Sequence, residues 1–206
     1  MKELNLGSGV ILRSAGISDL PGLFKVCLET GDSGKDATHL HQLPDLLSEI
    51  YVAPYVIYQP EFSYALKAAD KIVGYLLAAL DTKSFEEQLV KEYWPKIKSK
   101  YAKPDQSISE KDRDLLLELQ KQGFSSEDLT TKYPSHLHID IIAAYQGSGY
   151  GKSMISFLLN QLKDSGSKGV HLHMAASNDR ARYFYKSFGF AEISEDANEC
   201  IMGLSF

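Results

Sequence analysis

The sequence contains very little cysteine, with only Cys27 and Cys200 among its 206 residues. Two thiols in a chain of this length do not form a disulfide framework, which excludes the small disulfide-stabilised folds and favours a reducing, intracellular setting. Cys27 lies in an amphipathic pattern and is interpreted as a small core residue. We expect a cytoplasmic protein, with the nucleus as a second location if the source is a eukaryote.

Long apolar runs and an excess of positive charge are also absent. The longest apolar segment, Ile72–Leu80, has the length of a strand rather than the roughly 18 residues that span a bilayer. Met1–Leu12 lacks the basic start and the apolar stretch of a secretion signal. The net charge is −5 and the pI is about 5.7. We therefore expect neither a nucleic-acid binder nor a protein that binds anionic membranes.

The composition is otherwise that of an ordinary globular protein, with 44% hydrophobic and 24% charged residues. Its length suits one domain, and we assign residues 1–206 to a single domain that carries an insertion. Apolar spacing predicts the elements of the first third. These are a strand at Gly9–Arg13, a helix from the cap Ser18 to Glu29, a helix at Pro44–Tyr51, and a hairpin of Phe62–Ala68 and Lys71–Asp81.

Residues 84–134 differ from both flanks in being rich in Lys, Glu, Asp and Gln. The pattern predicts helices near residues 85–100 and 110–122, with breaks at Pro104 and Gly123. The leucines within residues 115–119 make the segment too apolar for a disordered linker. We interpret it as a helical insertion between two strands.

The last third has the pattern of a βαβ unit followed by a helix and two strands. Such a unit makes its two strands parallel, with a right-handed crossover. Together with the antiparallel hairpin, this predicts an α/β (α+β) protein with a mixed central sheet. The expected elements are a strand at His136–Ala144, a helix at Ser153–Ser165, a strand at Gly169–Ala176, a helix at Asp179–Phe188, and strands at Phe190–Ile193 and Glu199–Leu204.

A glycine-rich turn, Gln146–Lys152, connects the first strand of this unit to its helix. Alternating glycines let the backbone approach a ligand and adopt positive φ, and the start of the helix favours an anion. A merely tight turn would need one glycine rather than three. The P-loop pattern fails because Gln146 stands at its first glycine, and the dinucleotide pattern fails because Lys152 stands at its last. The remaining pattern is Gln-x-x-Gly-x-Gly.

This turn resembles the pyrophosphate loop of the GNAT acetyltransferase family. His138–Gln146 resembles the family's fourth strand, and Asn178–Phe190 resembles its Asn…Ala…Tyr…Gly-Phe segment. One departure is Ala143, where the family usually has a proline near the bulge that splays its strands. The insertion is similar to that of the acetyltransferase-like C-terminal domain of O-GlcNAcases. That domain is regarded as lacking the glycine loop, which this chain keeps.

The resemblance implies a single GNAT fold, with helices on both faces of a mixed sheet and acetyl-CoA as cosubstrate. It implies an N-acetyltransferase in which a primary amine, from a small molecule or a lysine side chain, attacks the thioester in a ternary complex. The alternative is a non-catalytic acetyl-CoA-binding or protein-interaction domain, and a nucleotide-binding protein is a third hypothesis. Gly31–Gln42 and the insertion are expected to shape the acceptor cleft of a monomer or homodimer.

The resemblance also assigns residues to the cosubstrate. The backbone of Ile139–Ile141 is expected to run along the pantetheine, which Asn178 also contacts. Tyr185 would protonate the departing sulfur, unless its ring only packs in the core beside Phe184. The pyrophosphate is expected at the turn and the residues after it, which are Gln146, Gly147, Ser148, Gly149, Tyr150, Gly151, Lys152 and Ser153.

Two residues are candidates for the general base. His173 takes a fifth-strand position where several members of the resembling family have a catalytic carboxylate, and its reference pKa of roughly 6.5 suits the task. Asp140, on the neighbouring strand, is the competitor, and its carboxylate could instead orient His173. Either side chain could also be a satisfied buried polar group.

All six histidines occur as His-x-His pairs, at positions 39/41, 136/138 and 171/173. Residues two apart in a strand share a face, and the last two pairs fall on neighbouring predicted strands. A metal site there would be geometrically feasible. No cysteine accompanies these pairs, and the one close carboxylate is Asp140. We therefore expect no metal and attribute the pairs to the polarity of a substrate cleft.

Overall fold

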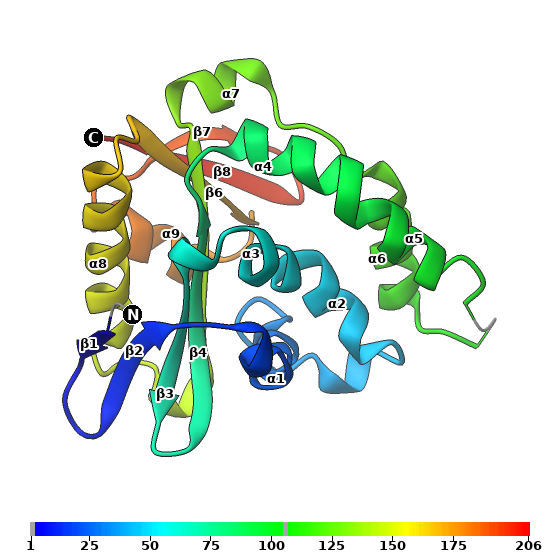
Figure 1. The fold of residues 1–206 in the computed structure, drawn as a ribbon, viewed down its shortest axis with the longest axis horizontal. Coiled ribbons are helices and arrows are strands. Elements are labelled where there is room, and N and C mark those ends of the chain that lie inside the picture. The colour runs from blue at the N-terminus through cyan, green and yellow to red at the C-terminus, as the bar shows by residue number, and fades with distance from the viewer. Residues whose placement is uncertain (1–2, 105–106) are drawn as a thin grey trace.

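The computed structural model describes residues 3–104 and 107–206, which form one eight-stranded mixed sheet (Figure 1). The strand order is β1-β2-β3-β4-β5-β6-β8-β7, and β5 and β6 form the parallel pair. The predicted mixed central sheet is confirmed. The strands are β1 (Glu3–Asn5), β2 (Val10–Ser14), β3 (Ser63–Ala68), β4 (Lys71–Ala79), β5 (Ser135–Ile141), β6 (Gly169–Ala175), β7 (Ala191–Glu195) and β8 (Glu199–Ser205).

Helices cover both faces of the sheet, as predicted, and β4 shows why its apolar run is continuous (Figure 1). Alternate strand residues point to opposite faces. Tyr75 and Leu77 pack with helices α1 to α6, together with Cys27, whereas Leu76 and Ala78 pack with α8. The helices are α1 (Leu20–Thr30), α2 (Pro44–Tyr51), α3 (Ala53–Tyr58), α4 (Thr82–Gln88), α5 (Trp94–Lys100), α6 (Glu110–Lys121), α7 (Glu127–Lys132), α8 (Tyr150–Asp164) and α9 (Asp179–Lys186).

The segment between β4 and β5 is helical and packs on the α1–α3 side of the sheet. A π-helical turn, Leu89–Tyr93, joins α4 to α5, so the predicted helix near residues 85–100 is one interrupted stretch. Leu115 and Leu119 bury one side of α6 in the core. Residues 105–106 of the predicted insertion lie outside the described residues. The assignment of residues 1–206 to one domain stays a prediction.

Several element boundaries differ from those that the sequence pattern indicates. Helix α8 begins at Tyr150 rather than at Ser153, because Gly149 adopts the left-handed conformation and acts as its N-cap. The pattern does not indicate β1, which is only three residues long and polar at both ends. It also misses α3 and α7, which are six residues long each and carry little periodicity.

The parallel strands β5 and β6 pair only at their beginnings. Their register joins Ser135 to Val170 and His136 to His171, after which the strands part. On its other edge, β5 stays in regular register with β4 from His136 to Ile141. The strands β5 and β6 therefore separate even though Ala143 stands where the resembling family usually has a proline. Their separation involves no register shift between β5 and β4. The part of β5 beyond His136 is left with an open edge that faces a cleft.

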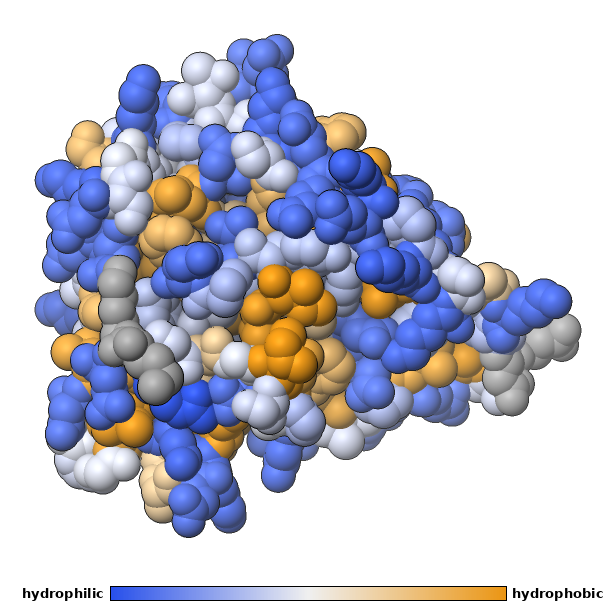
Figure 2. All heavy atoms as spheres, in the orientation of Figure 1, coloured by the Kyte–Doolittle hydropathy of each residue, from blue (hydrophilic) through white to orange (hydrophobic). Residues whose placement is uncertain are grey.

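The face of the molecule in Figure 2 is mostly hydrophilic, with an apolar patch over the region of α1 and α3. Exposed large apolar residues include Ile17 before α1, at 60%, and Ile57 on α3, at 40%. Within the described residues, no helix combines the length and the apolar character that crossing a bilayer requires.

Candidate active site

The turn between β5 and α8 has the backbone geometry of an anion site. Gly147 and Gly149 have φ values of 79° and 84°, a conformation that side chains disfavour. A Cβ atom added at either glycine would meet no atom within 4 Å, so both face open space. The first backbone N–H groups of α8 point toward this space, because a helix provides no acceptor for them. The Gln146 side chain donates a hydrogen bond of 2.6 Å to the Ile141 carbonyl and fixes the turn.

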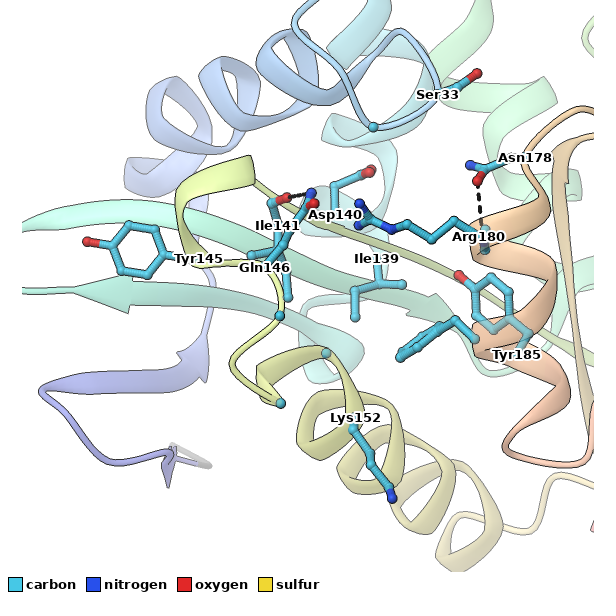
Figure 3. A pocket seen from close by; sticks show the side chains of 16 residues that line it. Ser33, Ile139, Asp140, Ile141, Tyr145, Gln146, Lys152, Asn178, Arg180 and Tyr185 are labelled. Carbon is cyan, nitrogen blue, oxygen red and sulfur yellow. Dashed lines mark hydrogen bonds between the residues drawn. The ribbon is translucent and has the colours of Figure 1, made fainter.

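This turn opens onto a cavity of about 570 Å³, which we call the loop cavity (Figure 3). It follows the open edge of β5 and ends against α9. Ser148 on the turn, and Tyr150 and Ser153 at the start of α8, lie outside the lining of this cavity. The other predicted cofactor residues line it together, and these are Ile139, Asp140, Ile141, Gln146, Gly147, Gly149, Gly151, Lys152, Asn178 and Tyr185.

Two cations line the loop cavity, and the sequence motifs predicted only one of them. Lys152 is exposed, and its side chain extends away from Ile139 and Tyr185 (Figure 3). Arg180, on α9, extends its guanidinium group across the cavity (Figure 3). A signal for Arg180 existed, because it is a cation two residues after the helix cap Asn178 in a motif already assigned to the cosubstrate. Arg180 adds positive charge to a cavity whose backbone already favours anions.

Helix α9 brings Asn178 and Tyr185 to the same cavity. The Asn178 side chain accepts a hydrogen bond of 3.1 Å from the Ala181 N–H and caps the helix. Tyr185 is 7% exposed, with its hydroxyl group directed into the cavity (Figure 3). Burial, and after it the charge of Asp140, raises the pKa of Tyr185 above the usual value. The phenol therefore keeps its proton at neutral pH, with its ring packed beside Phe184.

Asp140 lies where the loop cavity meets a second cavity. Its carboxylate accepts a hydrogen bond of 2.5 Å from the Tyr75 hydroxyl. Burial raises the pKa of Asp140 to about 6, although hydrogen bonds from Tyr75 and Thr30 oppose the shift. The carboxyl group is thus largely ionised at neutral pH and is a stronger base than an exposed aspartate.

The second cavity, of about 450 Å³, lies under one side of α6, and we call it the α6 cavity. Asp140, Asn178 and Tyr185 line both this cavity and the loop cavity. Residues of the loop after α1, including Ser33 and Gly34, also line both. Residues of Gly31–Gln42 and of the insertion thus line a cavity next to Asp140, Asn178 and Tyr185. That this cavity receives an acceptor stays a prediction.

His173 lines the α6 cavity but not the loop cavity. Its Nδ1 atom lies 3.0 Å from a carboxylate oxygen of Glu199, and the two side chains are 37% and 48% exposed. Asp140 accepts a hydrogen bond from Tyr75, and the carboxylate recorded beside His173 is that of Glu199, so an orienting role of Asp140 toward His173 stays a prediction. Between the two candidate bases, the structure brings Asp140 to the junction of the cavities and leaves His173 to one side.

The remaining histidines near the sheet are mostly engaged with neighbouring groups in the core. His136 lies 2.7 Å from both the Tyr55 hydroxyl and the Thr82 hydroxyl. His171 lies 2.8 Å from the Tyr133 carbonyl. Burial and neighbouring histidines lower the pKa of His138 to about 4, so the ring is neutral. Across residues 3–104 and 107–206, no group of three or more His, Cys, Asp or Glu side chains is arranged to hold a metal ion.

Comparison with known proteins places this geometry in one family. Residues 118–190 match the model of the acetyltransferase (GNAT) family. Protein O-GlcNAcase of Rattus norvegicus is 28% identical over 179 residues, which cover 86% of this chain. The chain spans about a fifth of the length of that relative, 19%. A ribosomal-protein bS18-alanine N-acetyltransferase of Haemophilus influenzae is 39% identical over 56 residues, which are 27% of this chain and 38% of that protein.

Solved structures extend the match to nearly the whole chain. The crystal structure of SsHAT superposes with a TM-score of 0.84 and 30% identity, over 96% of this chain and 98% of that one. The PaiA N-acetyltransferase of Thermoplasma acidophilum in complex with coenzyme A has a TM-score of 0.59 and 12% identity, over 96% of this chain and 99% of its own. At that identity the likeness concerns the fold alone.

Proposed function

We propose that this chain, which belongs to the GNAT acetyltransferase family, transfers an acetyl group from acetyl-CoA to a primary amine within a ternary complex. The observation that carries this proposal is the junction of the two cavities at Asp140, Asn178 and Tyr185. A ternary complex needs separate spaces for donor and acceptor that meet at the reacting atoms. The loop cavity and the α6 cavity have this relation.

The donor belongs in the loop cavity, because its chemistry matches the groups there. The pyrophosphate would lie against the turn at Gly147 and Gly149 and the first N–H groups of α8. The pantetheine would pair with the main chain of Ile139–Ile141, which the parting of β5 and β6 leaves with an open edge. This arrangement directs the thioester toward Asp140 and Tyr185.

Asp140 is the proposed general base. An amine with a reference pKa of roughly 10.4 must lose a proton before its nitrogen attacks the thioester carbon. Raising the pKa of Asp140 from 3.8 to about 6 makes this proton transfer more favourable by about two pKa units, or about 3 kcal/mol. The Tyr75 hydroxyl holds the carboxylate in place at the junction.

Tyr185 is the proposed acid. As the C–N bond forms and the C–S bond breaks, the sulfur carries charge that a positioned hydroxyl group can stabilise and protonate. Its raised pKa keeps Tyr185 protonated until that point. The nitrogen loses two protons in the reaction and the sulfur gains one, so one proton is released for each acetyl group transferred.

A thiol-release assay with acetyl-CoA tests the proposal against a panel of polyamines, aminosugars, amino acids and lysine peptides. Calorimetry with CoA and with ATP runs in parallel. Acetylated amine and free CoA in equal amounts would support the proposal. CoA binding without transfer to any amine would favour a non-catalytic binding domain, and tighter binding of ATP than of CoA would favour a nucleotide-binding protein.

A further inference from the structure

One face of α6 lines the α6 cavity, and that face is acidic. Lys111, Asp114, Leu115 and Glu118 all line the cavity, and their spacing places them on one side of a helix. Leu115 is buried in the core, which fixes the rotation of the helix. The inserted segment therefore supplies charged groups to the space next to the reacting atoms, in addition to the groups that the sheet supplies.

The charge of the α6 cavity is opposite to that of the loop cavity. The described lining residues of the α6 cavity include four carboxylates and Lys111, whereas those of the loop cavity include Asp140, Arg180 and the exposed Lys152. The four carboxylates of the α6 cavity are Asp32, Asp114, Glu118 and Asp140. An acceptor in this space meets a negative field.

A third cavity, of about 240 Å³, continues from the α6 cavity past the histidines, and we call it the histidine cavity. Tyr51, Glu118, His138 and His173 line both spaces, so the two cavities adjoin. Among its described lining residues are three glutamates and no Lys or Arg. An elongated acceptor that entered beside Asp140 would therefore reach a second acidic region.

Glu118 lines both cavities, and Glu199 lines the histidine cavity. The Tyr51 hydroxyl donates a hydrogen bond of 2.5 Å to Glu118, which leaves the carboxylate charge uncompensated. After burial, the charge of Glu118 raises the pKa of Tyr51, and the charge of Glu199 adds a smaller contribution. Both carboxylates therefore act on the same hydroxyl group. The neighbouring His138 ring is neutral and offers no positive charge, and Glu199 also lies 3.0 Å from His173 Nδ1.

We propose that the acceptor is a small aliphatic amine with a second ammonium group, which binds between Glu118 and Glu199 while the reacting amine lies at Asp140. This inference rests on the proposed function and specifies its acceptor. The methylene chain would lie along the Tyr51 and Leu115 side chains, which line the α6 cavity. The faces of Tyr51 and of the neutral His138 ring add a surface that suits a cation.

Putrescine and n-butylamine provide the test, because they have the same carbon chain and differ by one ammonium group. The ratio of their kcat/KM values should exceed about 10 in the unmodified chain, because a charge-assisted contact is worth about a tenfold change or more. Glu118→Gln and Glu199→Gln should each lower that ratio by about tenfold. Glu87→Gln removes one charge from an exposed position of α4 and should leave the ratio unchanged.

Two outcomes would overturn the inference. One is a ratio near one in the unmodified chain, and the other is a capped lysine amide acetylated as well as putrescine. If no amine is acetylated, the proposed function fails, and calorimetry of putrescine with the CoA-bound chain decides the inference separately. Binding that weakens in Glu118→Gln and Glu199→Gln but not in Glu87→Gln would support it, and absence of binding would overturn it.

Discussion

The loop cavity and the α6 cavity share a wall at Asp140 and Tyr185 but are built in different ways. At one end of the loop cavity the wall is main chain, from two glycines with positive φ, the start of α8 and the open edge of β5. The α6 cavity is formed by side chains from segments far apart in the sequence, including the loop after α1 and the inserted helix α6. A main-chain site suits a ligand common to a whole family, whereas a side-chain site can differ between its members.

A buried carboxylate connects the inserted helix α6 to the loop before α2. Asp112, which is 0% exposed, accepts hydrogen bonds of 2.6 and 3.0 Å from the N–H groups of Gln42 and Leu43 and lies 2.8 Å from His41 Nδ1. The side chain of a helix in the insertion thus satisfies the N–H groups just before α2. Because His41 also lines the α6 cavity, Asp112 connects the position of the insertion to the shape of that cavity.

The largest effect is expected from Gly149→Asp, which acts on the loop cavity alone. The new side chain would project into open space in front of α8, where its charge repels a pyrophosphate. CoA binding should become undetectable by calorimetry while putrescine binding persists. Gly166→Asp is the matched control, because Gly166 has φ +88° and open space at the other end of α8. Equal loss in both variants would mean that backbone strain, not the phosphate site, causes the effect.

Asp140→Asn is expected to have the next largest effect and tests the role of Asp140, which lines both cavities. Because this variant lacks the proposed base, kcat/KM should fall by about 10² to 10⁴ while CoA affinity changes little. The acidic limb of the pH profile, expected near the pKa of about 6, should disappear. His173→Gln should lower activity by less than about tenfold and keep that limb. The reverse result would make His173 the base.

The difference between the cavities also decides how much the sequence could predict. Most residues of the loop cavity could be predicted from the glycine pattern and from the resemblance that Gln146–Lys152 and Asn178–Phe190 carry, because these motifs are continuous and their geometry is local. Arg180 lies within such a motif and was missed because its charge was not assigned a role. That Glu118 and Glu199 line one cavity was beyond prediction, because only the tertiary fold brings a helix of the insertion and the last strand to the same space. Likewise, the tyrosine that holds Asp140 comes from another strand, and pairing of β4 with β5 places it there.

Tyr185→Phe should have a smaller effect, because other groups still hold both substrates. The ring keeps its packing beside Phe184 and Phe190, so stability should change little. Turnover should fall by about 10- to 100-fold in the thiol-release assay, with the Kd of CoA unchanged. A thioester with a less basic leaving thiol should restore part of the loss. Undiminished turnover with acetyl-CoA would make Tyr185 a packing residue.

Asp112→Asn should affect the α6 cavity and leave the loop cavity unchanged. The NH₂ of the new amide faces a group that now donates a hydrogen bond to the Asp112 carboxylate. This mismatch lowers the free energy of unfolding by about 1–3 kcal/mol. The KM for the amine should rise by about tenfold because the loop at His41 loses its anchor, while the KM for acetyl-CoA stays the same. Asp45→Asn, at an exposed position in the first turn of α2, is the control. A parallel rise of both KM values would mean that Asp112 supports the whole fold rather than one cavity.

The smallest effect concerns stability, and its sign is opposite to the effect on activity. Because burial raises the pKa of Asp140 from 3.8 to about 6, the folded chain binds this proton more tightly than the unfolded chain does. The stability from this group is complete below the unfolded value and is lost as the pH rises through about 6. The amide that Asp140→Asn introduces is neutral at every pH, so this variant should unfold in urea with a free energy about 1 kcal/mol larger near pH 8, and the gain should shrink toward pH 5.

The expected gain is smaller than a full pKa shift of two units would give, which is about 3 kcal/mol. The Asp140 carboxylate is only partly buried and keeps its hydrogen bond from Tyr75. Asp114→Asn, at an exposed carboxylate on the rim of the α6 cavity, should show no such gain. If Asp140→Asn instead destabilises the chain equally at both pH values, its carboxylate serves the fold through Tyr75, and the raised pKa that supports its role as base is wrong.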